Sequence, residues 1–208
     1  MQIGASGLVA DSLGGTQVFF DGIPAPLLYA VDGQVNVLVP YGIAASSQVN
    51  LQIATNAGAS QTGPLQVVPV QPNVIAVLNS DGSTNSVLNP AAPGTTVSIL
   101  VSGAGVLNRA LPDGTIAGSP APLPALPVQV DFAYSCSLGF AVRKIPCFGN
   151  QAVTPSYAGA IPGAVVNLLR VDAQVPAPSF PGAYGFSIAI RVGSWQSPSF
   201  PLYLVTGH

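Results

Sequence analysis

The sequence predicts an all-β protein of two tandem immunoglobulin-like β-sandwiches with little or no helix. Three observations carry this prediction. Apolar and polar residues alternate in short runs along the chain. Glycine and proline, the residues of turns, number 23 and 21 among 208 residues, whereas glutamate is absent and Lys144 is the only lysine. Because Glu and Lys are strong helix formers that usually cover exposed helix faces, their near absence favours strands joined by turns.

The alternation defines a series of expected strands, each bounded by Gly, Pro, Asn or Ser as the strands of a sandwich are. They span residues 17–20, 34–39, 49–53, 65–68, 74–78, 95–101, 126–132, 170–175, 184–192 and 201–205. Asp-Gly pairs, which suit tight hairpin turns, follow at 21–22, 32–33, 81–82 and 113–114.

An internal repeat divides the chain. The sequence of residues 157–158 and 170–176 is similar to that of residues 29–30 and 34–40. Each copy ends in a proline, and these two prolines, Pro40 and Pro176, lie 176 − 40 = 136 positions apart. We therefore expect a first immunoglobulin-like domain at 1–70. We expect a second domain at 71–208, with a Pro-rich connector at 120–127 and a loop between the two cysteines.

The two expected domains are unequal. Residues 5–8 resemble residues 101–104, which follow the expected strand 95–101. The first copy keeps only Gln2 and Ile3 of that strand, so its opening strand is expected to be truncated. A missing strand leaves an open sheet edge, which another chain can fill by adding a strand.

Composition excludes several functions. Charged residues make up 6% of the chain, and the net charge is −2, where an ordinary globular domain has about 25% charged residues. The five cationic residues are scattered, which predicts no nucleic-acid binding. No uninterrupted apolar stretch is long enough to span a membrane. Residues 1–4 lack the features of a signal peptide, so an exported protein would have its leader outside this chain.

Cys136 and Cys147, the only cysteines, have ten residues between them. In a β-rich chain this spacing favours one disulfide closing a hairpin-like loop, and therefore an extracellular or cell-surface location. Two buried thiols are the alternative. A zinc site would need two further ligands, and His208 is the only histidine.

Several linked motifs resemble a known family. They lie in order at 14–18, 21–29, 34–40, 78–83, 89–94, 157–159 and 162–163. Together they resemble the uncharacterised C-terminal domain found on exported acidobacterial (Solibacter-type) proteins. The resemblance implies an Ig-like or IPT/TIG-like region at the end of a longer exported protein, with no known catalytic residues. The chain departs from the pattern at residues 170–172, Arg-Val-Asp where the family has Gln-Val-Asn, and in the inserted segment between the cysteines.

No catalytic residues are expected, and the chain is predicted not to be an enzyme. The glycine-rich segments at 4–7 and 103–105 do not form the Gly-x-Ser-x-Gly pattern, and no interior histidine can act as a base. Glycoside hydrolysis needs paired carboxylates. Of the seven aspartates, those at the Asp-Gly pairs are expected to bond to the turn backbone instead.

Calcium is the one cofactor that a motif suggests. Asn79, Asp81, Ser83 and Asn85 present oxygen atoms at alternate positions, and Gly82 permits a tight bend. The terminal bidentate acid of a calcium loop is absent. The alternative is a turn stabilised by Asn and Asp side chains.

Aromatic residues near the C-terminus suggest polysaccharide binding. Trp195, Tyr184 and Phe200 could stack on sugar rings if they were exposed, whereas the alternative is packing in the core of the sandwich.

Gln34 and Asn36 alternate with apolar neighbours and are expected on the exposed face of a strand, as interface candidates. The leading hypothesis is a non-catalytic structural or adhesive module that packs against copies of itself or other domains of a longer exported protein, as in a filament. Its low charge favours such association. The alternative hypothesis is a carbohydrate- or calcium-binding accessory module of a secreted enzyme.

Overall fold

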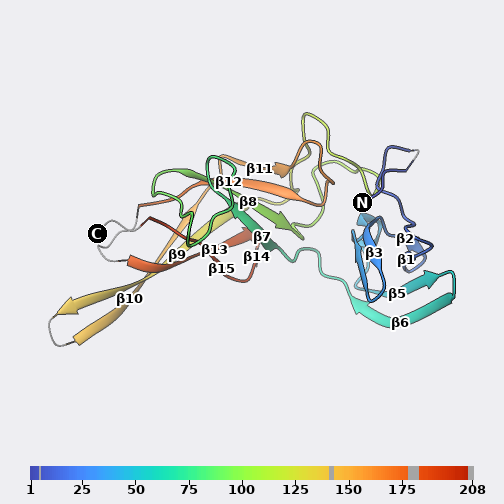
Figure 1. Ribbon diagram of the computed structural model, residues 1–208, viewed down its shortest axis with the longest axis horizontal. Helices are drawn as coiled ribbons and strands as arrows, with labels where there is room; N and C mark the ends of the chain where they lie inside the picture. Colours follow the sequence, from blue (N-terminus) through green and yellow to red (C-terminus); the bar gives the residue numbers. More distant parts are fainter. Residues whose placement is uncertain (5, 141–142, 178–182, 206–208) are drawn as a thin grey trace. The chain divides into compact units, whose positions relative to one another are not determined.

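The computed structural model describes residues 1–4, 6–140, 143–177 and 183–205, and for 60–62, 136–140, 143–148 and 183–184 it describes the backbone alone. The described residues form β-strands and one 3-10 helix, Tyr41–Ile43 (Figure 1). The predicted all-β class with little helix is therefore confirmed. Among the described residues, no helix is long and apolar enough to cross a membrane.

The chain divides into two compact units, each with two antiparallel sheets. Unit 1 comprises Met1–Pro69, Gly105–Ala125 and Ala160–Asn167. Unit 2 comprises Val70–Ala104, Leu126–Gly159 and Leu168–His208. The expected ranges of 1–70 and 71–208 need correction, because two later segments belong to unit 1. Hydrogen bonds tie one of them there: the Val9 N–H donates to the Gly114 carbonyl at 2.9 Å, and the Tyr41 N–H donates to Asp113 Oδ1 at 2.7 Å.

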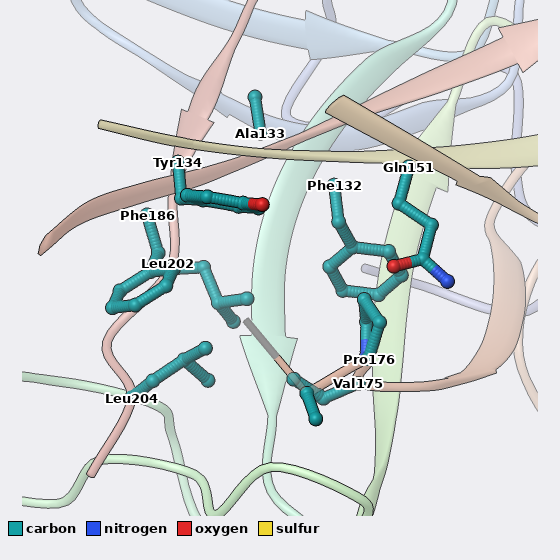
Figure 2. A pocket seen from close by; sticks show the side chains of 10 residues that line it. Phe132, Ala133, Tyr134, Gln151, Val175, Pro176, Phe186, Leu202 and Leu204 are labelled. Atoms are coloured by element: carbon teal, nitrogen blue, oxygen red, sulfur yellow. The ribbon is translucent and has the colours of Figure 1, made fainter. Parts of the chain in front are cut away.

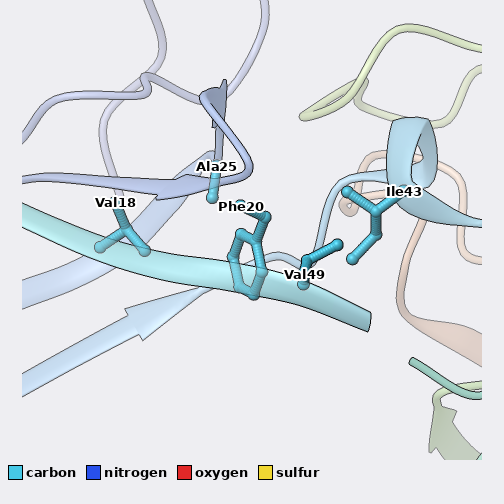
Figure 3. Close-up of a cluster of buried hydrophobic side chains, with 5 residues drawn as sticks. All are labelled: Val18, Phe20, Ala25, Ile43 and Val49. Carbon is cyan, nitrogen blue, oxygen red and sulfur yellow. The ribbon is translucent and has the colours of Figure 1, made fainter. Parts of the chain in front are cut away.

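Unit 1 has a four-stranded sheet and a separate hairpin. The sheet order is β2-β1-β5-β6, and β3 pairs only with β4. The strands are β1 Gln17–Phe20, β2 Ile23–Pro24, β3 Leu27–Val31, β4 Gln34–Val37, β5 Gln48–Thr55 and β6 Gly58–Gln66. Its core is a cluster of buried side chains, which Figure 3 shows. Val35 and Val37 of β4 are partly buried and pack against this cluster. The cluster consists of Val18, Phe20, Ala25, Ile43 and Val49.

Unit 2 has two larger sheets, with strand orders β11-β12-β8-β7 and β10-β9-β13-β14; β15 also pairs with β13. The strands are β7 Asn73–Leu78, β8 Thr96–Ser102, β9 Val128–Phe140, β10 Arg143–Val153, β11 Tyr157–Ala160, β12 Leu169–Gln174, β13 Ala183–Val192, β14 Trp195–Gln196 and β15 Phe200–Pro201. Alternate residues of β8, β9, β12 and β13 are fully or almost fully buried, as the period of two requires. They include Val97, Ile99, Val101, Val130, Val171, Ile188 and Ile190.

Two of the predicted hairpin turns are confirmed. Asp21-Gly22 joins β1 to β2, with φ of 49° and 79°, the pair of left-handed residues that a tight hairpin needs. Asp32-Gly33 joins β3 to β4. Asp113-Gly114 also forms a turn, closed by a 3.2 Å hydrogen bond from the Thr115 N–H to the Pro112 carbonyl, but it joins no two of the described strands. Gly114 is buried, and an added Cβ would lie 3.0 Å from the Val9 carbonyl oxygen. That glycine serves close packing between segments.

Candidate functional site

An exposed face on the β3–β4 hairpin is the candidate site. We call it the hairpin face and define it as Tyr29, Val31, Gln34 and Asn36. The register places Tyr29 opposite Asn36 and Val31 opposite Gln34, and cross-strand partners share a face. Tyr29 and Val31 are 44% and 50% exposed, and Gln34 Nε2 donates to Asn36 Oδ1 at 2.9 Å. Gln34 and Asn36 thus lie on an exposed face, while their role as an interface stays a prediction.

The backbone of β4 is paired on one side only. Its sheet contains just two of the described strands, β3 and β4. Residues flanking a two-residue hairpin loop exchange hydrogen bonds, so Val31 and Gln34 form such a pair, and Tyr29 and Asn36 form the next. The alternation of an antiparallel ladder then directs the N–H and C=O of Val35 away from β3. This edge can accept another strand.

In unit 2 the side chains that correspond to Gln34 and Asn36 are Arg170 and Asp172 of β12, and both interact with other residues of that unit. Asp172 of β12 accepts a hydrogen bond from Ser98 Oγ of β8 at 2.7 Å, and Arg170 Nε lies 3.2 Å from Asp172 Oδ2. The Arg170 guanidinium carbon lies 4.9 Å from the centroid of the Tyr157 ring, a cation–π contact. The charged groups that replace Gln34 and Asn36 in unit 2 therefore pair with each other and with neighbours in the unit, although Arg170 Nε is buried in an ion pair without a hydrogen bond among the described residues.

Tyr41 follows the hairpin in unit 1. Burial of the phenol, and then the charge of Asp113, raise the pKa of Tyr41 to about 12. Both effects disfavour the phenolate. Tyr41 therefore stays neutral at physiological pH and is no candidate for proton transfer.

The oxygen atoms proposed for calcium accept hydrogen bonds from their own neighbourhood. Asn79 Oδ1 accepts from Asn85 Nδ2 at 3.0 Å, and Asn85 Oδ1 accepts from the Tyr203 N–H at 2.8 Å. Hydrogen bonds from the Ser83 hydroxyl and N–H lower the pKa of Asp81 and form a turn of the Asx kind. Within the described part of the chain, no three His, Cys, Asp or Glu residues gather as metal ligands. This geometry favours a structural role, and calcium binding stays a prediction.

The aromatic candidates do not form a shared platform. Trp195, on β14, is 40% exposed, whereas Phe200 of β15 is partly buried. They lie opposite Val192 and Ile188 of β13, four residues apart, which is about 13 Å along a strand. The Tyr184 side chain lies outside the described residues. Polysaccharide binding stays a prediction that this arrangement does not strengthen.

Unit 2 has a small apolar depression that is largely filled by the side chains that line it (Figure 2). Phe132, Tyr134 and Phe186 line it together with Leu202 and Leu204, and Leu202 lies beside Phe186. Its enclosed space is about that of one water molecule. The Tyr134 ring covers Gly149, where an added Cβ would collide with the ring, and the centroid of the Tyr134 ring lies 6.2 Å from that of Phe186. The depression is too small for a sugar ring.

The predicted loop between the cysteines is a long β-hairpin, which confirms its hairpin form. Figure 1 shows the paired strands β9 and β10, and their register places Cys136 directly opposite Cys147. Opposed residues of an antiparallel pair have Cα atoms about 4.5–5.5 Å apart, which a disulfide can span. Both side chains lie outside the described residues, so the disulfide stays a prediction.

We expect the cysteines of the protein, when it is produced in an oxidising compartment, to resist alkylation until a reductant is added, as measured by intact mass under denaturing conditions. Reduction should then lower the free energy of unfolding by roughly 2–3 kcal/mol, because the bond closes a short loop in the unfolded chain. The Cys136→Ser/Cys147→Ser variant should match the reduced protein and be insensitive to reductant. Alkylation of the unreduced protein would contradict the disulfide.

Comparison of the chain with protein-family models, curated proteins and solved structures finds no match. The resemblance to the acidobacterial domain therefore rests on the sequence motifs. The functional argument rests on the chain's own residues, of which the hairpin face is the most distinctive group. Sequence reasoning missed Tyr29 and Val31 in this face, because residues 27–31 are all apolar and their sequence does not mark which side chains are exposed.

Proposed function

We propose that this chain is a non-catalytic, extracellular structural or adhesive module that associates with copies of itself through an open sheet edge. The observation that carries the proposal is the one-sided pairing of β4 beside the exposed Tyr29 and Val31. An exposed strand edge presents N–H and C=O groups that another strand can satisfy. Exposed apolar side chains beside it add buried area when two chains meet.

Composition supports the same function. With 6% charged residues, little electrostatic repulsion separates two copies. Export is proposed from this composition and from the expected disulfide. The absence of a catalytic role is proposed because the sequence has no interior histidine and no glutamate.

Sedimentation velocity over a range of concentrations, followed by electron microscopy, tests self-association. We expect dimers or longer assemblies, and we expect Val31→Lys to shift the population toward monomer, because a charge on the hairpin face must be desolvated on pairing. Leu88→Lys is the matched control: Leu88 is 96% exposed, belongs to unit 2 and is not part of the hairpin face.

Two results would overturn the proposal. One is a monomer at the highest soluble concentration. The other is equal weakening of association by Val31→Lys and Leu88→Lys, which would assign the association to general hydrophobicity.

A further inference from the structure

Unit 2 begins with β7 and β8, and from β9 onward it repeats the strand connections of unit 1. In each series a hairpin (β1–β2 and β9–β10) is followed by a second hairpin-like pair (β3–β4 and β11–β12), and a long strand then returns beside the first (β5 beside β1, β13 beside β9). The sequence repeat aligns residues 34–40 with 170–176, so β4 corresponds to β12. Asn36 and Val35 thereby correspond to Asp172 and Val171.

The repeat shows what the open side of β4 lacks. In unit 2, β12 pairs antiparallel with β8 from Leu169 opposite Val101 to Gln174 opposite Thr96 (Figure 1). The inward side chains of β8, Val97, Ile99 and Val101, are all 0% exposed. In unit 1, the described strands supply no counterpart of β8 beside β4.

The missing neighbour changes the burial of corresponding residues. Val171 of β12, which lies beside β8 in the same sheet, is only 1% exposed. Its counterpart Val35 is only partly buried against the core of unit 1. A strand added beside β4 would cover Val35 and pair its free N–H and C=O groups.

We propose that the open side of β4 binds an extended segment with the chemistry of β8, added antiparallel as the third strand of the β3–β4 sheet. The proposal deepens the proposed function, on which it rests, by naming the partner's chemistry. The segment carries apolar side chains at alternate positions, with one of the size of isoleucine opposite Val35, as Ile99 lies opposite Val171. It carries few charges, because its inward face enters an apolar core.

The polar position of the segment is also specified. Ser98 lies opposite Asp172 and donates its hydroxyl hydrogen to that carboxylate. Asn36, the counterpart of Asp172, accepts a hydrogen bond from Gln34 and has a further acceptor site on the same oxygen. The segment is therefore expected to carry a serine or threonine opposite Asn36.

A synthetic peptide with the sequence of residues 94–103, labelled with a fluorophore, tests the proposal against the full chain. We expect saturable binding by fluorescence anisotropy. We also expect slowed hydrogen exchange of the Val35 amide, because that N–H becomes paired. Protection confined to another edge, such as β6, β7 or β10, would overturn the proposal, as would the absence of saturable binding.

Peptide variants identify the contacts without changing the protein's fold. Ile99→Asp in the peptide should abolish binding, because it places a charge against Val35. Ser98→Ala should weaken binding by up to about tenfold through the loss of one hydrogen bond. In the protein, Val35→Pro removes the outward N–H and should abolish binding, with an unchanged circular dichroism spectrum as the check on folding. Equal affinity for the Ile99→Asp peptide would also overturn the proposal.

Competition separates this inference from the proposed function. If the chain self-associates and the peptide neither binds nor disperses the assemblies, the assignment of the β4 edge is wrong while self-association stands. If the chain is a monomer and the peptide binds with protection of Val35, self-association is wrong while the strand-binding edge stands.

Discussion

Replacing Arg191 with methionine is expected to lower the free energy of unfolding of unit 2 by about 2–3 kcal/mol, below the usual cost of breaking a fully buried ion pair, because the Arg191 side chain is 38% exposed. Arg191 Nη2 lies 2.7 Å from Asp131 Oδ2, and the Asp131 side chain is only 4% exposed. Asp131 Oδ1 is buried with no hydrogen-bond partner among the described residues. Removing Arg191 would therefore take away the partner that the structure gives this carboxylate.

The residues packed around Asp131 also make the stability of unit 2 sensitive to the loss of Arg191. Asp131 lies opposite Ala189 on β13 and Ala152 on β10, in the interior of its sheet. Neither alanine can supply a replacement donor from its side chain. The aliphatic stem of methionine keeps part of the volume of arginine, so the loss measured is chiefly that of the guanidinium.

Urea denaturation followed by the fluorescence of Trp195, the only tryptophan, measures this change within unit 2. Arg170→Met is the control within the same unit: the Arg170 side chain is 41% exposed, its partner Asp172 keeps the hydrogen bond from Ser98, and the variant should cost about 1 kcal/mol. The double variant Asp131→Leu/Arg191→Met should recover most of the loss, since it removes the uncompensated charge. A loss below about 1 kcal/mol for Arg191→Met would show that the pair contributes no more than a surface ion pair.

Substitution of Asn85 by alanine is expected to lower the free energy of unfolding of unit 2 by about 2–4 kcal/mol, because several hydrogen bonds end on this one buried amide. Its Nδ2 donates to the Tyr203 carbonyl at 2.8 Å and to Asn79 Oδ1, and its Oδ1 accepts from the Tyr203 N–H at 2.8 Å. The amide thus pairs with the backbone of Tyr203 as a neighbouring strand would. Without it, the C-terminal segment should also exchange its amide hydrogens faster.

Asn89→Ala provides the comparison, because Asn89 is exposed and its side chain bonds only within the same loop, to Ser83 and Thr84. It should cost no more than about 1 kcal/mol. Asn85→Asp separates donor from acceptor: its carboxylate still accepts from the Tyr203 N–H but repels the carbonyls, so it should be as destabilising as alanine. Similar melting temperatures for Asn85→Ala and Asn89→Ala would exclude the proposed anchoring role.

Local patterns predicted the strands and turns that depend on few neighbours. Asp21-Gly22 and Asp32-Gly33 form hairpins as expected, because both residue types tolerate the backbone that such turns need. The strands Leu27–Val31, Arg143–Val153 and Tyr157–Ala160 were not predicted. Their sequences lack a clean alternation, and they form because a partner strand lies beside them.

The candidate site was predicted in part. The alternation around Gln34 and Asn36 correctly indicated an exposed strand face. The spacing of Asn79 and Asn85 suggested a metal loop, whereas the structure directs Asn85 to Tyr203, 118 residues away in sequence. No local signal encodes such a bond, because its partner is a backbone group that every residue carries.

The all-β class and the exposed face of β4 follow from sequence alone, because alternation and turn chemistry act over a few residues. The tertiary structure alone decides that residues 105–125 join unit 1 and that β4, unlike its counterpart β12, keeps one side unpaired. Strand neighbours are set by contacts between distant segments, and the free energy of those contacts depends on the whole core. The open edge, and with it the strand-binding function we propose, is therefore a property of the assembled sheets.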